Sequence, residues 1–188
     1  DISDMVEVTY TNRHRQLGLI QGENTWFERA DIRDLTGKDI WKHIMGLEIL
    51  KGKEMPQIDL MIGGPSCQGF SRAGRRDKSD PRNTLFGEYV RVIKEVKPKY
   101  IVLENVEGFI DMQFMGYKGI TGIEYPDGSV TPYILRSELR EIGYETLEPK
   151  ILNAVDYGVP QRRRRIIFIG YRKGLKAPKL SLIHISEP

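Results

Sequence analysis

Two spacings of hydrophobic residues alternate along the chain. Residues 60–62 and 100–103 are short apolar runs, which are typical of strands buried on both faces of a sheet. Apolar residues three and four apart recur between these runs, which is typical of helices that cover a sheet. Helical spacing covers residues 1–13, 36–50, 85–96 and 133–142, and strand-like patterns cover residues 26–30, 60–62, 100–103, 145–152 and 165–171. This alternation predicts one doubly wound α/β sheet with ligands at the C-terminal ends of its strands, and a glycine-rich surface insertion at 116–132.

The residues after the first apolar run are placed to carry a nucleophile. The stretch 59–71 reads D-L-M-I-G-G-P-S-C-Q-G-F-S, so two glycines and a proline end the strand and turn the backbone before Cys67, the one cysteine in the sequence. A buried cysteine is more often a small hydrophobic side chain of the core. A core cysteine, however, would stand within the apolar run and not beyond its glycines. We therefore expect a reactive thiol on a loop at the edge of the sheet.

Two further groups are expected at the same edge. Glu104 directly follows the second apolar run, and the sequence Q-R-R-R-R at 161–165 precedes the last strand. If the last strand runs antiparallel to the others, its beginning lies at the edge where the parallel strands end. Alternation along it would then send Arg163 and Arg165 to one side. Taken singly, each group has an ordinary explanation, as a solvated carboxylate at a strand end or as the basic flank of a hairpin.

Together these three pieces resemble the DNA (cytosine-5) methyltransferases. The loop is similar to the family's G-G-P-P-C-Q-G-F-S motif, with Ser66 in the place of a proline that would stiffen the backbone. Gln161, Arg163 and Arg165 match the family's Gln-x-Arg-x-Arg pattern. The resemblance implies a Rossmann-like, S-adenosylmethionine-dependent methyltransferase sheet, mostly parallel with an antiparallel last strand. It also implies an incomplete catalytic domain over 1–180, without the family's first strand, glycine loop and target-recognition region.

The final residues, 181–188, continue no pattern of the preceding sequence. They read S-L-I-H-I-S-E-P and resemble the translation of a common sequencing adapter. We expect a non-native tail there, and we expect the incomplete domain to be inactive by itself.

The resemblance also implies a role for each chemical group. Cys67 would add to carbon 6 of a cytosine flipped out of double-stranded DNA, which makes carbon 5 able to accept a methyl group. Glu104 would bind N3 and the exocyclic amine, and Arg165 would donate to O2. Arg163 and Gln161 would orient the loop or the DNA backbone. Contacts to DNA are expected from Gln68, Ser71, Arg72, Asn105 and Gln161.

S-adenosylmethionine is the methyl donor that the resemblance implies. Asp1 falls where the family has an acid on the ribose hydroxyls, and Asp31 falls where an acid meets the adenine amine. Each has an ordinary alternative, since Asp1 can be a plain chain end and Asp31 a helix cap. The expected cofactor-binding residues are Asp1, Ile2, Asp31, Ile32, Gly64, Pro65 and Leu85.

Composition excludes only a few classes of protein. A net charge of +3 does not by itself indicate nucleic acid, and a solvated face explains the basic run 162–165 equally well. A single cysteine rules out an intramolecular disulfide and suits a reducing, intracellular compartment. No apolar run reaches membrane-spanning length, and three scattered histidines without cysteine partners give no reason to expect a metal. We expect a monomer that binds double-stranded DNA and no membrane.

Two other functions fit the same residues. An RNA (cytosine-5) methyltransferase of the same fold would need the same thiol and carboxylate. A non-catalytic relative would bind nucleic acid through the basic edge, with Ser66 as a mark of decay. The sequence Q-G-F-S at 68–71 favours DNA over RNA. The intact residues Cys67, Glu104, Gln161, Arg163 and Arg165 speak against decay.

Overall fold

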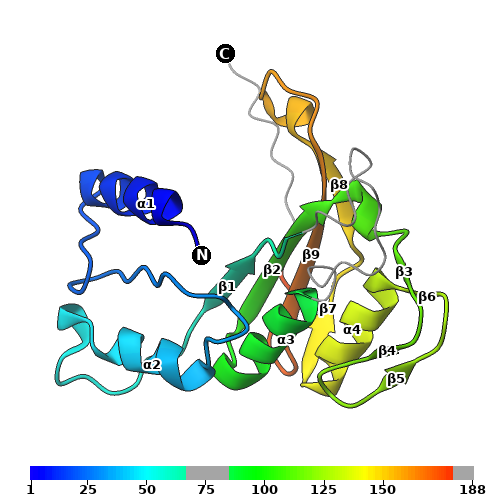
Figure 1. Cartoon of the computed structure of the whole chain (residues 1–188), viewed down its shortest axis with the longest axis horizontal. Helices are drawn as coiled ribbons and strands as arrows, with labels where there is room; N and C mark the ends of the chain where they lie inside the picture. Colours follow the sequence, from blue (N-terminus) through cyan, green and yellow to red (C-terminus); the bar gives the residue numbers. More distant parts are fainter. Residues whose placement is uncertain (67–84, 180–188) are drawn as a thin grey trace. The chain divides into compact units, whose positions relative to one another are not determined.

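The computed structural model describes residues 1–66 and 85–179, and the chain divides into two compact units (Figure 1). The first unit comprises Asp1–Ile58 and Lys94–Lys97, and the second comprises Asp59–Ile93 and Pro98–Pro188. Four predicted site residues and the predicted non-native tail lie outside the described residues, namely Cys67, Gln68, Ser71, Arg72 and 181–188.

The helices of the first unit begin and end where capping residues stand. They are α1 (Asp4–Gln16), α2 (Gly37–Met45) and the 3₁₀ helix η1 (Glu48–Leu50). Ser3 caps the start of α1, and Thr36 forms a capping box with Asp39 at the start of α2. Gly46 ends α2, so the predicted helix 36–50 is divided into α2 and η1.

The predicted strand at 26–30 is wrong, because these residues form no strand. The side-chain amide of Gln21 binds both backbone groups of Phe27, with its Oε1 accepting from the N–H at 2.7 Å and its Nε2 donating to the carbonyl at 3.1 Å. A neighbouring strand would have to bind these same groups. The Phe27 ring instead packs on Tyr10 of α1, with 5.0 Å between ring centroids.

The second unit is built on a five-stranded sheet in the order β1-β2-β9-β7, with β8 pairing with the beginning of β9. Its strands are β1 (Leu60–Gly63), β2 (Tyr100–Val106), β7 (Tyr144–Thr146), β8 (Lys150–Asn153) and β9 (Arg164–Arg172). β1 is parallel to β2, whereas β9 is antiparallel to β2, β7 and β8. Four strands thus share one direction, which confirms the predicted sheet with its antiparallel last strand. The predicted strand 145–152 is divided into β7 and β8.

Helices α3 (Leu85–Val96) and α4 (Thr131–Glu141) lie on the same face of this sheet (Figure 1). Alternate residues of β2 and β9 are buried in the core that includes these helices, and among them are Ile101, Leu103, Ile166 and Phe168. Burial of these apolar side chains is the main driving force for this packing. Because strand side chains alternate, Asn105 shares the buried face whereas Glu104 lies on the other, half-buried face.

The predicted surface insertion 116–132 is partly built into the core. It belongs to two nested hairpins, in which β3 (Gln113–Phe114) pairs with β6 (Ser129–Val130) and β4 (Tyr117–Lys118) pairs with β5 (Glu124–Tyr125). The carboxylate of Glu138 on α4 is 1% exposed and accepts hydrogen bonds from Thr121 N at 3.0 Å, Thr121 Oγ1 at 2.6 Å and Tyr125 Oη at 2.8 Å. These bonds satisfy the buried carboxyl oxygens and fix the hairpin to the helix.

Candidate active site

The loop that leads to Cys67 begins beside the carboxylate of Glu104. Gly63, the last residue of β1, is paired in register with Leu103, so the next residues of the two strands lie side by side. A Cβ atom added to Gly64 would stand 3.5 Å from Glu104 Oε2, which is ordinary van der Waals contact. The parallel pairing predicted from the two apolar runs therefore places the start of the loop next to the acid.

The end of β1 is fixed from the helical face by Tyr89. A Cβ atom on Gly63 would lie 2.4 Å from the Tyr89 ring, so only glycine fits there. The Tyr89 hydroxyl lies 3.1 Å from the Met61 carbonyl oxygen and 2.9 Å from the Val102 carbonyl oxygen. Burial raises the pKa of Tyr89, so the hydroxyl remains a neutral donor that joins the two strands.

Glu104 and Arg165, which were expected at the same edge of the sheet, form an ion pair there. Arg165 Nε lies 2.7 Å from Glu104 Oε1, and Arg165 Nη1 donates to the Arg164 carbonyl oxygen at 2.8 Å. The antiparallel register sets Arg165 opposite Val106, two residues beyond Glu104 on the same face. β2 runs three residues further than predicted, so Glu104 lies within the strand and not after it. The meeting of the two side chains is confirmed, and their catalytic roles remain predictions.

The other arginines of the basic run lie apart from Glu104. Arg164 Nη2 lies 3.0 Å from Glu107 Oε1. Arg163 is exposed and precedes β9, and its backbone N–H donates to Asn153 Oδ1 at 3.1 Å. Gln161 is also exposed. The structure therefore places Arg165 at the acid, while Arg163 and Gln161 lie on the exposed β8–β9 connection.

Asn105 was expected among the DNA contacts, and the structure corrects this expectation. Its side chain is 2% exposed, Nδ2 donates to the Pro65 carbonyl oxygen at 3.1 Å, and Oδ1 accepts from the Val106 N–H at 2.9 Å. Both polar atoms of the amide are thus bound within the protein, and neither is available to DNA. Asn105 instead fixes the backbone two residues before Cys67.

Replacing Asn105 by aspartate is expected to lower the free energy of unfolding by about 1–3 kcal/mol, because a carboxylate oxygen would then face the Pro65 carbonyl oxygen. In the full reading frame that encodes this chain, the methyl transfer that the resemblance implies should fall by roughly 10- to 100-fold, since a small displacement of the expected nucleophile Cys67 is costly. Urea denaturation and a tritiated methyl-transfer assay measure the two effects. Asn153→Asp is the matched control, because Asn153 uses its side-chain oxygen as an acceptor that aspartate retains. An Asn105→Asp variant with unchanged stability and rate would contradict the role assigned to this amide.

The predicted cofactor residues are divided between the two units. Asp1, Ile2, Asp31 and Ile32 belong to the first unit, whereas Gly64, Pro65 and Leu85 belong to the second. Asp31 is not the cap of α2, since Thr36 fills that position. Its carboxylate instead binds Arg33, with Oδ1 2.9 Å from Nε and Oδ2 2.6 Å from Nη2. The hydrogen bonds from the Arg33 side chain and backbone lower the pKa of Asp31 to about 2.

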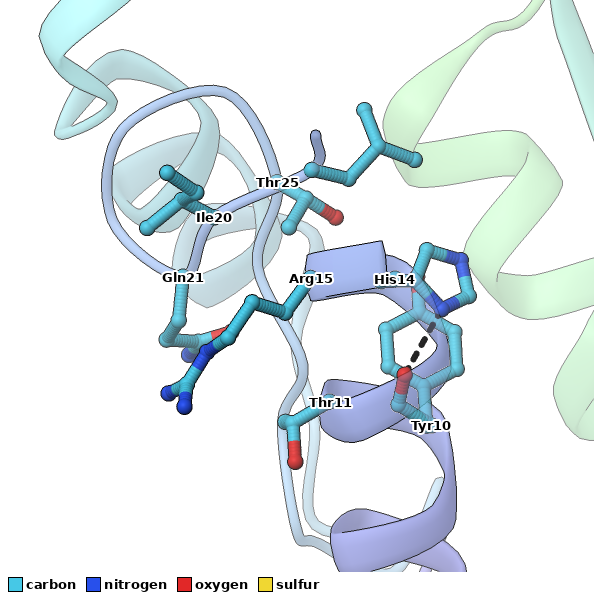
Figure 2. A pocket seen from close by; sticks show the side chains of 8 residues that line it. Tyr10, Thr11, His14, Arg15, Ile20, Gln21 and Thr25 are labelled. Atoms are coloured by element: carbon cyan, nitrogen blue, oxygen red, sulfur yellow. Dashed lines mark hydrogen bonds between the residues drawn. The ribbon is translucent and has the colours of Figure 1, made fainter. Parts of the chain in front are cut away.

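A small pocket of the first unit contains none of the predicted site residues. Figure 2 shows the His14 ring stacked on the Tyr10 ring, with His14 Nδ1 2.8 Å from the Tyr10 carbonyl oxygen. The cavity of about 20 Å³ is large enough for one water molecule and too small for a nucleoside. Its lining residues are Tyr10, Thr11, His14, Arg15, Leu19, Ile20, Gln21 and Thr25.

Residues 1–66 and 85–179 contain neither a cluster of metal ligands nor a membrane-spanning helix. Within these ranges no three or more His, Cys, Asp or Glu side chains come together as metal ligands. The helices of this described part are also too short or too polar to cross a bilayer.

Comparison with known sequences identifies similar proteins. A model of the family described as C-5 cytosine-specific DNA methylase matches residues 28–187. The type II methyltransferase M.XorII of Xanthomonas oryzae pv. oryzae is 40% identical over 77% of this chain and 30% of its own length. M1.HphI of Haemophilus parahaemolyticus, also a type II methyltransferase, is 42% identical over 78% of this chain and 34% of its own length. The chain thus spans about a third of the length of these relatives.

Solved structures show the same fold. The S. pombe Dnmt2 methyltransferase is 25% identical, with a TM-score of 0.57 over 95% of this chain and 43% of that protein. The Entamoeba histolytica methyltransferase EhMeth is 18% identical, with a TM-score of 0.61 over 100% of this chain and 48% of that protein, and shows the fold alone. The predicted methyltransferase sheet is therefore confirmed.

Proposed function

Since the chain belongs to the C-5 cytosine-specific DNA methylases, we propose that the protein transfers a methyl group from S-adenosylmethionine to carbon 5 of cytosine in DNA. The observation that carries this proposal is the position of Glu104. One of its oxygens binds Arg165, and the other faces Gly64, three residues before Cys67. An acid that is paired with a guanidinium thus lies beside Gly64, from which the chain leads to the thiol.

A nucleophile is needed because carbon 5 of cytosine does not accept a methyl group unaided. In the proposed reaction the Cys67 thiolate bonds to carbon 6, and the electron pair of the 5,6 double bond becomes available at carbon 5. Carbon 5 then forms its bond to the methyl group while the bond between that methyl group and the donor's sulfur breaks, and the electron pair of the broken bond stays on the sulfur. A base removes the proton from carbon 5, the double bond forms again, and the thiolate leaves carbon 6. S-adenosylmethionine, when bound, supplies the methyl group as a sulfonium.

Glu104 and Arg165 supply the stabilisation that the addition requires. As electron density moves into the ring, a protonated Glu104 donates to N3 while its other oxygen accepts from the exocyclic amine. Arg165 holds the carboxyl in position through Nε, which leaves further guanidinium donors for the cytosine O2. Arg165 is only 23% exposed, so water competes weakly for these hydrogen bonds.

The residues of the first unit fit the methyl donor by their chemistry. Asp1 and Asp31 offer carboxylate acceptors to the hydroxyl groups of a ribose and the amine of an adenine, respectively. Ile2, whose side chain is 71% exposed, offers an apolar surface to the purine face. Gly64, Pro65 and Leu85 are also proposed to bind the methyl donor, as the resemblance to the family implies.

Double-stranded DNA is the substrate we favour, because the description of the matching family names DNA. A base stacked in a duplex cannot meet a thiol at the end of a strand, so the target cytosine has to be flipped out. The exposed side chains of Gln161, Arg162 and Arg163 are suited to contact phosphates. We further propose that the protein acts as a monomer in an intracellular compartment.

The test is covalent trapping on 5-fluorocytosine. The full reading frame that encodes this chain is expressed in a host free of cytosine methylation, and 5-methylcytosine is mapped in its DNA to find the target. A duplex with 5-fluorocytosine at that target should form a stable adduct in the presence of S-adenosylmethionine, because fluorine cannot leave carbon 5 as a proton does. DNA binding without methylation or adduct would support the non-catalytic alternative, and an adduct on RNA alone would support the RNA enzyme.

A further inference from the structure

Asp31 is held in one orientation by the residue two positions further along the chain. Its carbonyl oxygen accepts from the N–H groups of Asp34 at 3.0 Å and Leu35 at 3.2 Å, which closes a turn. Its carboxylate Oδ1 accepts from the Arg33 backbone N–H at 2.9 Å and from Arg33 Nε at 2.9 Å, and Oδ2 accepts from Arg33 Nη2 at 2.6 Å. The guanidinium therefore binds both oxygens in the two-point geometry that only arginine offers.

This arrangement leaves a specific acceptor site on the carboxylate. An ionised carboxylate has about four lone-pair sites, and the Arg33 bonds use two on Oδ1 and one on Oδ2. The second lone pair of Oδ2 remains for one external N–H donor. The side chain of Asp31 is 24% exposed, so such a donor can reach it from solvent.

We propose that Arg33 is a positioning residue for the methyl donor: its guanidinium fixes Asp31 so that the remaining lone pair of Oδ2 receives the amino group of adenine. This inference rests on the proposed function, in which Asp31 binds that amine. Arg33 itself does not touch the cofactor. An unrestrained aspartate loses rotational freedom when it binds a ligand, and this loss weakens binding. Arg33 fixes the Asp31 side chain before the ligand binds, so the loss is smaller.

At neutral pH the contribution of Arg33 is orientation and not ionisation. The hydrogen bonds of Arg33 hold the pKa of Asp31 at about 2, and without them the pKa would return toward its ordinary value of 3.8. At pH 7.5 the carboxyl is ionised in both cases. A hypoxanthine ring presents a carbonyl oxygen where adenine presents an amine, so a fixed carboxylate should reject hypoxanthine by repulsion between two acceptors.

The test measures binding of S-adenosylhomocysteine and of its hypoxanthine analogue, S-inosylhomocysteine, by calorimetry at pH 7.5, with the full reading frame that encodes this chain. Arg33→Ala retains the backbone N–H that donates to Asp31 Oδ1 and removes only the guanidinium. It should weaken S-adenosylhomocysteine binding roughly 5- to 20-fold and lower the adenine preference by a similar factor. The KM for S-adenosylmethionine should rise while kcat stays within about twofold.

Three further variants separate positioning from a general structural effect. Arg33→Lys should resemble Arg33→Ala, because an ammonium cannot bind both oxygens in one plane. In an Asp31→Asn background, Arg33→Ala should cause no further loss beyond about twofold, since its effect passes through the carboxylate. Arg29→Ala is the matched control: Arg29 is 54% exposed in the same segment and pairs with Glu7 at 3.7 Å, so binding should not change.

The outcomes distinguish the inference from the function on which it rests. If the wild-type protein does not bind S-adenosylhomocysteine, both are overturned. If it binds and Arg33→Ala binds equally well, the inference alone is overturned. Tighter binding by Arg33→Ala would show that Arg33 competes with the cofactor for Asp31, which also overturns it. If Arg33→Ala weakens binding as much in the Asp31→Asn background as in the wild type, Arg33 acts independently of the Asp31 carboxylate. That result also overturns the inference.

Discussion

Replacing Cys67 by serine is expected to lower methyl transfer to DNA by roughly 10⁴- to 10⁶-fold, the scale on which enzymes lose activity when their nucleophile is removed. Serine has nearly the same size, so the loop is not forced to change. Its hydroxyl is not deprotonated at neutral pH, whereas a cysteine thiol supplies a thiolate with a strong intrinsic reactivity toward carbon 6. The measurement is single-turnover transfer of a tritiated methyl group to a duplex that contains the mapped target.

The Cys67→Ser variant should also fail to form the 5-fluorocytosine adduct while it still binds S-adenosylhomocysteine. Its melting temperature serves as the control for folding. A variant that retains more than about a tenth of the wild-type rate would contradict the covalent mechanism. An adduct on the serine variant would show that another nucleophile attacks the base.

Replacing Glu104 by glutamine is expected to lower the rate of methyl transfer by about 10²- to 10⁴-fold, the usual contribution of a general acid. Glutamine retains the shape and the hydrogen-bonding oxygen, but it cannot carry a proton to N3. It also leaves the Arg165 guanidinium without the carboxylate that lies 2.7 Å from its Nε. The loss should appear in the single-turnover rate, while the affinity for duplex DNA changes by less than about threefold.

Glu107→Gln is the matched control for this substitution. Glu107 is also a carboxylate paired with an arginine of the basic run, since its Oε1 lies 3.0 Å from Arg164 Nη2. It follows the end of β2 and is not bound to Arg165. We expect a rate within about threefold of wild type, as for an exposed ion pair. If Glu104→Gln and Glu107→Gln lower the rate of methyl transfer equally, the rate depends on the negative charge at this edge. The particular position of Glu104 would then have no role.

The comparison of sequence and structure is most informative for the two strands that position Glu104. The apolar runs 60–62 and 100–103 correctly predict β1 and β2, but burial on both faces does not account for β1, in which Leu60 and Ile62 are 49% and 68% exposed. The run does not determine where β2 ends. β2 continues to Val106 because β9 lies beside it and pairs with its last residues. Hydrogen bonds to a partner distant in the sequence thus extend a strand beyond its apolar residues.

Two of the expectations that failed, the strand 26–30 and the surface insertion 116–132, failed because a polar side chain bound a partner that hydrophobic spacing does not reveal. The predicted strand 26–30 did not form because Gln21 binds the backbone of Phe27. Glu138 is buried on a helix because a hairpin supplies three hydrogen bonds to its carboxylate. Neither contact follows from local hydrophobic spacing.

The sequence by itself determined the order of β1, α3, β2, α4 and β9, because the spacing of apolar residues distinguishes buried strands from helices. The antiparallel last strand came from the resemblance to the family, and with it the alternation of side chains places Glu104 and Arg165 at one edge. Only the tertiary structure decided that Asn105 is turned inward to hold Pro65, and that Arg33 binds both oxygens of Asp31. The physical reason is that hydrogen bonds depend on distances and angles between particular atoms, which residue type and spacing do not specify.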